Sequence, residues 1–110
     1  MMHDEHPVEY YMYKPITENP IVIDFSKVRY YDELYELLKQ KFGLPDYTGH
    51  NFDALWDCLS LRWMHNKQAT IELHGVFSIR EDLQPDMDGI LDIFSDVHKK
   101  CPGVRFIIKS

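Results

Sequence analysis

The chain has 110 residues, a length that fits one domain. Hydrophobic residues make up 45% of it, which is enough for a single core and too much for a disordered protein. Its formal charge of -6 and its pI of about 5.4 argue against direct binding to DNA or RNA, which depends on lysine and arginine. Acidity favours a basic protein partner, although it also serves solubility alone.

Two cysteines, Cys58 and Cys101, are too few to staple a fold, and we expect both to be reduced thiols in a cytoplasmic protein. The N-terminal residues are not basic and no apolar run follows them, so no secretory signal is expected. No apolar stretch approaches the roughly 18 residues that span a membrane, and we expect no membrane association.

The first 20 residues differ from the rest of the chain. They contain three prolines, which disfavour a helix or a central strand, and a tyrosine cluster: Pro7, Pro15, Pro20, Tyr10, Tyr11 and Tyr13. We therefore divide the chain into an N-terminal extension, residues 1–20, and one domain, residues 21–110. Residues 10–14 could form a short edge strand, a strap across the domain, or part of a loose tail.

The apolar run at 21–25 predicts a buried strand. Residues 32–42 predict a helix, because apolar side chains recur on one helical face and lysines lie at its C-terminal end. Gly43 ends this helix and Pro45 prevents its continuation. The apolar face consists of Leu34, Leu37, Leu38 and Phe42.

A loop at 46–50 leads into a second helix, for which Asn51 is the predicted N-cap. Apolar residues follow at the helical spacing i, i+3, i+4, i+7, and we expect them to be buried: Phe52, Leu55, Trp56 and Leu59. Asp53 falls in the first turn, where a carboxylate favours the helix dipole, whereas Asp57 lies deeper and gains less from it.

The second half of the chain predicts a strand, a short helix ended by Pro85, a longer helix and a last strand, at 69–73, 76–83, 86–100 and 104–108. With right-handed crossovers, the order of elements gives an α/β fold: a small three-stranded parallel sheet packed by three to four helices. The strands are short and mostly apolar, as buried parallel strands are.

The sequence offers little for an enzyme. Asp53 and Asp57 could form an acid–base pair, but carboxylates in that role usually come from separate elements across a cleft. The cysteines adjoin apolar helix faces, the histidines are scattered, and no glycine-rich phosphate loop is present. We expect no catalytic residue, no metal and no cofactor.

The same two aspartates favour a binding function. A spacing of four residues puts both carboxylates on one helical face, where they repel each other unless a cation comes from outside. With the preceding loop they offer a surface that resembles a nucleic-acid backbone, formed by Tyr47, His50, Asn51, Asp53 and Asp57 with Trp56 behind. The alternative is a solvated helix face with Trp56 in the core.

Residues 44–59 closely resemble the signature of the barstar family, small intracellular inhibitors of secreted bacterial ribonucleases. The matching run is Leu-Pro-acidic-Tyr, then Gly, then Asn, then Asp-Ala-Leu-Trp-Asp-Cys-Leu, and the order of elements agrees from residue 21 to residue 110. The resemblance implies a barstar-like fold in which the second helix and the loop before it plug the active site of a ribonuclease.

By matching position, Tyr47 would pack on the enzyme's substrate-base region. Asp53 and Asp57 would pair with its catalytic basic residues, with Asp57 as the phosphate mimic. The resemblance further implies that Gly49 and Asn51 shape the loop and that an acidic residue of the last helix, Asp96, contributes.

The chain departs from the family pattern at the proposed rim. A well-known family member has a second tyrosine at the position of Thr48 and a glutamate at the position of His50. Its tryptophan after the second helix is offset by one residue from Trp63. It has no counterpart of residues 1–20. The expected partner is therefore a basic ribonuclease other than barnase, such as a secreted toxin domain. The protein would act as an immunity protein, or antitoxin, in the bacterium that produces the toxin.

Two other functions remain open at this point. The chain could be a barstar-like regulatory module whose target is not a nuclease, or a small hydrolase that uses carboxylates. His50 could also make binding depend on pH, because an unperturbed histidine titrates near ~6.5.

Overall fold

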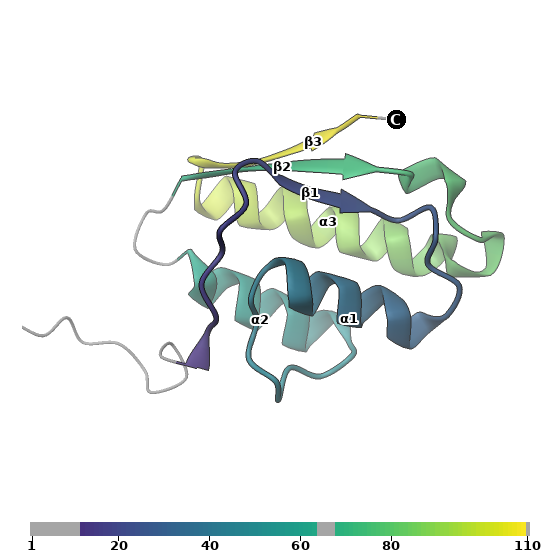
Figure 1. The fold of residues 1–110 in the computed structure, drawn as a ribbon, viewed down its shortest axis with the longest axis horizontal. Helices are drawn as coiled ribbons and strands as arrows, with labels where there is room; N and C mark the ends of the chain where they lie inside the picture. The colour runs from purple at the N-terminus through teal and green to yellow at the C-terminus, as the bar shows by residue number, and fades with distance from the viewer. Residues whose placement is uncertain (1–11, 64–67, 110) are drawn as a thin grey trace, which may run out of the picture.

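The computed structural model describes residues 12–63 and 68–109. In these residues three parallel strands form one sheet in the order β1-β2-β3 (Figure 1). The strands are β1 (Ile21–Asp24), β2 (Ala69–His74) and β3 (Val104–Ile108). The α-helices are α1 (Tyr31–Lys41), α2 (Phe52–Arg62) and α3 (Gln84–Lys100), with 3-10 turns η2 (Val76–Ser78) and η3 (Glu81–Leu83). The predicted α/β fold is confirmed.

All three α-helices lie on one side of the sheet (Figure 1). α1 packs against β1, α3 packs against β3, and α2 packs on α3. Burial along β1 therefore alternates: Ile21 and Ile23 are buried, whereas Val22 and Asp24 are exposed. The described helices thus cover the sheet on one face only. The apolar composition of the strands had suggested parallel strands of the kind that are buried on both faces.

An aromatic cluster joins the ends of the elements inside the core. Phe42, just after α1, meets Trp63 and Phe94 edge-on at ring-centroid distances of 5.5 and 5.8 Å. Phe94 stacks on Phe106 of β3 at 4.4 Å. Offset-stacked and edge-to-face pairs of this kind add to the free energy gained from burial alone. The cluster fixes the C-terminal ends of α1 and α2 relative to the sheet.

The predicted end of the first helix is confirmed. Gly43 has φ +59°, its N–H donates to the carbonyl of Gln40, and the Leu44 N–H donates to the carbonyl of Lys39 at 2.9 Å. These two bonds form the Schellman motif that commonly places glycine after a helix.

The predicted helix at 76–83 is instead the pair of 3-10 turns, η2 and η3. Pro85 does not end a helix there, because it lies in the first turn of α3. A proline is favoured in a first turn, since its missing N–H would have no helical partner. Within the described residues, none of the helices has the length and apolar character needed to cross a membrane.

Residues 13–18, which we call the N-terminal strap, cross the C-terminal end of α1 and reach α2 (Figure 1). Residues 13 and 14 belong to neither a helix nor a strand. The edge strand considered for residues 10–14 is therefore wrong for these two positions, and residues 10 and 11 lie outside the described part of the chain.

Candidate partner-binding surface

The second helix begins where the sequence predicted. Asn51 has an extended backbone, and its Oδ1 accepts the N–H of Ala54 at 2.8 Å. A β-carbon at Gly49 would lie 3.1 Å from Nδ2 of Asn51, so the glycine leaves room for the capping side chain. An N-cap of this kind contributes about 1 kcal/mol to helix stability, and it joins the loop at 46–50 rigidly to α2.

Asp53 and Asp57 are both exposed and lie one turn apart on α2. Within residues 12–63 and 68–109, neither carboxylate has a hydrogen-bond or ion-pair partner. Carboxylates of α1 do have one: Glu33 pairs with Arg29 and Glu36 pairs with Lys39. The face of α2 is therefore an uncompensated pair of negative charges.

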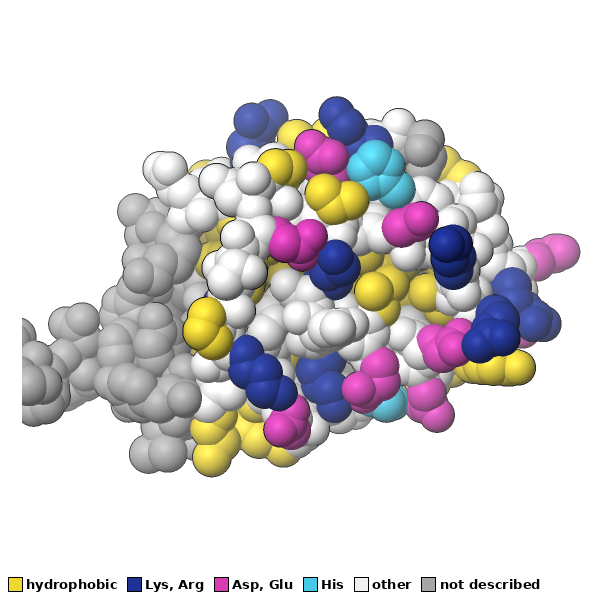
Figure 2. Space-filling model, in the orientation of Figure 1, with side chains coloured by type: hydrophobic (Ala, Val, Ile, Leu, Met, Phe, Trp, Pro, Cys, Tyr) yellow, Lys and Arg dark blue, Asp and Glu magenta, His cyan; other side chains and the backbone are white. Residues whose placement is uncertain are grey.

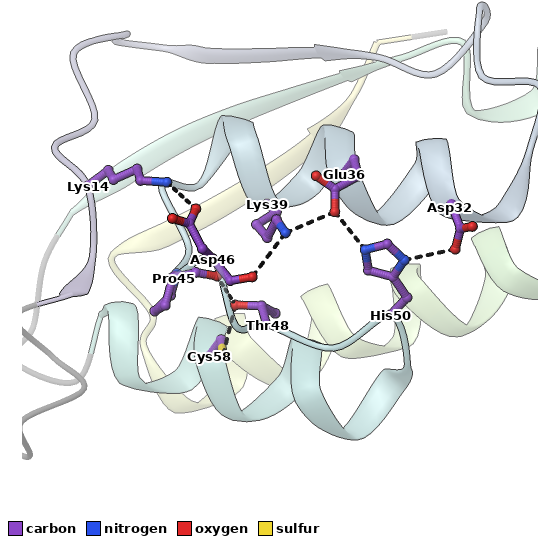
Figure 3. Close-up of polar contacts among 9 residues, drawn as sticks. All are labelled: Lys14, Asp32, Glu36, Lys39, Pro45, Asp46, Thr48, His50 and Cys58. Carbon is purple, nitrogen blue, oxygen red and sulfur yellow. Dashed lines mark hydrogen bonds and ion pairs between the residues drawn. The ribbon is translucent and has the colours of Figure 1, made fainter.

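The loop at 46–50 points two neighbouring side chains in opposite directions. Tyr47 is 55% exposed, whereas Thr48 is 7% exposed. The Thr48 hydroxyl donates to the carbonyl of Pro45 at 2.6 Å and lies 3.5 Å from Sγ of Cys58 on α2 (Figure 3). Because that donation uses the only hydroxyl hydrogen, the thiol is the donor in the second contact.

Two expectations about side chains of this region need correction. Residue 48 was assigned to the rim of the surface, but the buried threonine anchors the loop on α2 instead. Phe52, expected to be buried, is 41% exposed. Its ring does pack on Gly89 of α3, where a β-carbon would come within 2.3 Å of it.

His50 faces α1 rather than standing alone at the rim. Its Nδ1 lies 2.8 Å from a carboxylate oxygen of Asp32, and its Nε2 lies 2.6 Å from one of Glu36 (Figure 3). The imidazole also stacks on the ring of Tyr35, with centroids 5.8 Å apart, and the Tyr31 hydroxyl donates to the carbonyl of His50. Two carboxylate acceptors require both ring nitrogens to carry protons, so this geometry is that of an imidazolium.

The electrostatics agree with the geometry. Hydrogen bonds to Asp32 and then to Glu36 raise the pKa of His50 above its ordinary value. The pKa of Glu36 is lowered, first by its hydrogen bond to Lys39 and then by the one to His50. Sequence reasoning missed both acids. Their spacing of four residues was a usable signal, because it is the same spacing as that of Asp53 and Asp57.

Polar contacts connect the two ends of the loop through α1 (Figure 3). Nζ of Lys39 lies 2.9 Å from the Glu36 carboxylate and 3.3 Å from the carbonyl oxygen of Asp46. The Asp46 carboxylate in turn pairs with Lys14 of the strap. Acidic and basic side chains are likewise interspersed on the face seen in Figure 2. The uncompensated pair on α2 differs from this mixed pattern.

Trp56 and Asp96 border this surface from the direction of α3. Trp56 is half-buried, packs on the core, and has Nζ of Lys100 at 5.6 Å from its ring centroid. Asp96 is exposed, with Lys99 4.0 Å away. Because Asp96 and Lys100 are four residues apart on one helix, Asp96 lies on the side of α3 that adjoins α2. In the part of the chain that the structure describes, no hydrogen bond or ion pair joins Asp96 to α2 or the loop.

The described residues include no group of three histidine, cysteine, aspartate or glutamate side chains that could hold a metal ion. Cys101 is buried, as expected, and Cys58 is half-buried beside Thr48. The candidate site is a surface built on one helix and one loop, α2 and residues 46–50.

The fold and this surface together define a small parallel α/β domain that presents an acidic helix and loop. The family model described as "Barstar (barnase inhibitor)" matches residues 19–109. The chain therefore belongs to the barstar family. A protein of Bacillus subtilis (strain 168) named "Putative ribonuclease inhibitor YrdF" is 48% identical over 40 residues, which is 36% of this chain and 44% of that protein. The match thus spans less than half of that relative.

Proposed function

We propose that this protein inhibits a ribonuclease by binding over its active site with α2 and the loop at 46–50. The observation that carries the proposal is the uncompensated pair Asp53 and Asp57 on a capped, exposed helix. Membership of the barstar family and the name of the Bacillus relative support the choice of target class. The protein acts by binding and not by catalysis.

Each part of the surface has a place in the proposed complex. Asp57 takes the position of a substrate phosphate and pairs with the enzyme's catalytic cations, and Asp53 pairs beside it. Tyr47, more than half exposed, packs on the region that binds the substrate base. These groups are desolvated in the complex, where paired charges and aromatic anchors contribute most to affinity.

The remaining surface residues support or flank these three. Gly49 and Asn51 set the path of the loop and cap α2. Trp56 supports the helix from behind, and Asp96 adds an acidic contact from α3. His50, held by α1, forms the edge of the surface nearest that helix.

The partner is a basic ribonuclease or a ribonuclease-type toxin domain, and we propose a cytoplasmic immunity role in the bacterium that makes the toxin. The histidine at position 50 motivates one alternative. The family pattern has an acid at this position, whereas His50 pairs with two acids of α1. The rim therefore presents a different group to the partner. A regulatory module that binds a target other than a nuclease would keep the fold and lose inhibition.

The test is an RNA-cleavage assay with a panel of basic secreted ribonucleases and ribonuclease toxin domains. Wild type is compared with Asp57→Asn and with Glu72→Gln, which removes the same charge from β2 at a half-buried position. Inhibition of at least one enzyme by wild type and Glu72→Gln, with loss in Asp57→Asn, supports the proposal. Full activity of every enzyme at excess wild type would favour the regulatory alternative.

A further inference from the structure

The N-terminal strap precedes the family match, which begins at residue 19, yet it touches α2. The Tyr13 hydroxyl donates to the carbonyl of Cys58, one turn before the end of that helix. The Tyr13 ring is half-buried against the core, and the Arg62 guanidinium lies 5.5 Å from its centroid. One side chain of the strap is therefore held between the core and the helix that carries Asp57.

The next residue of the strap contacts the start of the loop. The Lys14 N–H donates to the carbonyl of Gly43 at 2.8 Å, and its ammonium pairs with the carboxylate of Asp46. A β-carbon at Gly43 would lie 2.4 Å from the carbonyl oxygen of Lys14. The glycine that ends α1 is thus also the point at which the strap backbone lies directly on the domain.

The Tyr13 phenol also interacts electrostatically with Tyr47 of the loop. Burial raises the pKa of Tyr13, with contributions from Cys58 and from the nearby phenol of Tyr47. A third contact, between Glu18 and Lys41 at 3.2 Å, fastens the far end of the strap to α1. The strap therefore contacts the end of α1, the loop and α2.

We propose that Tyr13 and Lys14 are positioning residues, which hold the loop at 46–50 and α2 in one fixed arrangement before a partner arrives. The effect on inhibition rests on the proposed function, whereas the effect on the loop does not. It also follows that residues 21–110 form the domain proper and that residues 13–18 of the extension complete its binding surface.

Preorganisation gives this arrangement a physical purpose. A loop that becomes ordered only in the complex loses conformational entropy on binding, and a loop already fixed avoids that loss. The Lys14–Asp46 pair is exposed, and such pairs contribute little alone. The backbone bond at Gly43 and the Tyr13 hydroxyl must therefore provide most of the restraint, with the ion pair setting the position of the loop's first residue.

Hydrogen exchange in the uncomplexed full-length protein tests the restraint. The reporter is the Thr48 amide, which donates to the carbonyl of Pro45 at 3.0 Å within the loop. Tyr13→Phe and Lys14→Gln are compared with Tyr30→Phe and Lys27→Gln, matched changes at exposed positions outside the strap. We expect about 2- to 12-fold faster exchange of Thr48 in Tyr13→Phe, the range for loss of one hydrogen bond. The rise should be smaller in Lys14→Gln, which removes only an exposed ion pair, and exchange should not change in the controls.

A double-mutant cycle separates positioning from a general loss of stability. Asp46→Asn and Lys14→Gln should each speed exchange of Thr48, and their combination should speed it no further than Asp46→Asn alone. Additive effects would mean that Lys14 does not act through Asp46. Unchanged exchange of Thr48 in both Tyr13→Phe and Lys14→Gln would overturn the proposal.

Inhibition of a ribonuclease gives the second readout. We expect the inhibition constant to rise in Tyr13→Phe and Lys14→Gln by the factor by which loop exchange rises, while the matched controls inhibit like wild type. An unchanged inhibition constant, despite faster exchange, would overturn the role of the strap in binding. If wild type inhibits no ribonuclease while exchange still rises, the proposed function fails and the restraint of the loop by the strap stands.

Discussion

Two helices of this molecule carry the same charge pattern with opposite outcomes. Asp32 and Glu36 on α1, like Asp53 and Asp57 on α2, are acidic residues spaced by four. The pair on α1 meets the imidazole of His50 from within the chain, whereas the described residues supply no cation to the pair on α2. Spacing alone thus identifies two acids that a cation would stabilise, and the tertiary structure decides whether the chain itself supplies that cation.

The largest effect should come from removing one acid of the uncompensated pair. We expect Asp57→Ala to weaken binding to the target ribonuclease by about 3–5 kcal/mol, because it leaves desolvated cations of the enzyme unpaired. The stability of the free protein should change by less than about 0.5 kcal/mol, as for other exposed positions. Calorimetry of the complex and urea unfolding of the free protein measure the two quantities. If Asp57→Ala and wild type bind the ribonuclease with equal affinity, Asp57 is not part of the interface.

Removing the internal cation breaks the other half of the comparison. His50→Gln leaves Asp32 and Glu36 facing each other with a neutral amide, and we expect stability at pH 6 to fall by about 1–2 kcal/mol, since charge-assisted hydrogen bonds at a partly exposed site are lost. The double variant with Asp32→Asn and Glu36→Gln serves as the background in which His50→Gln should have almost no effect. A full-sized loss in that background would show that stacking on Tyr35, and not the ion pairs, holds His50.

Protonation offers a third way to act on the α1 pair. Because Asp32 and Glu36 raise the pKa of His50 in the folded protein, the stabilisation is fully present below the unfolded-state pKa of about 6.5 and is lost as pH rises through the higher folded-state pKa. The other groups that face this site are Tyr31 and Tyr35, with Lys39 beside Glu36.

Urea unfolding between pH 5.5 and pH 9 should therefore show a fall in stability for wild type that is absent in His50→Gln. The histidine C–H resonances should report the raised pKa directly. A His50 pKa at or below 6.5 in the free protein would contradict the ion pairs. The opposite end of the loop is a useful contrast, because Lys14 lowers the pKa of Asp46, and the Asp46 carboxylate stays charged throughout this range.

Much of the fold followed from the sequence because burial dictates it. The apolar periodicities located each strand and α-helix, and Gly43 and Asn51 marked helix ends through backbone needs that are local. The start of the helix predicted at 86–100 was less accurate, because a proline can begin a helix as well as end one, and α3 begins at Gln84.

The site was only partly predictable, since its contacts join distant parts of the chain. Helical spacing singled out Asp53 and Asp57, and the resemblance gave them roles. No local rule, however, shows that Thr48 turns inward or that His50 reaches α1 across 14 to 18 residues of sequence. The strap was the least predictable part. The strap packs on the domain through a close approach of the Lys14 carbonyl to Gly43. The sequence does not show that these two backbone segments meet.

The smallest predicted effect tests the comparison most directly, because one chemical change should have opposite signs at the two pairs. Asp57→Asn removes repulsion between like charges and should stabilise the free protein by about 0.2–0.5 kcal/mol. Glu36→Gln removes the contacts with Lys39 and His50 and should destabilise it by about 0.5–1 kcal/mol. Both changes preserve side-chain shape and nearly preserve helix propensity, so urea midpoints at pH 6 and equal ionic strength isolate the charge. Destabilisation in both variants would mean that the α2 pair already has an internal partner in solution. A gain at Asp57 alone would mean that this helix keeps an unfavourable charge which a bound cation relieves.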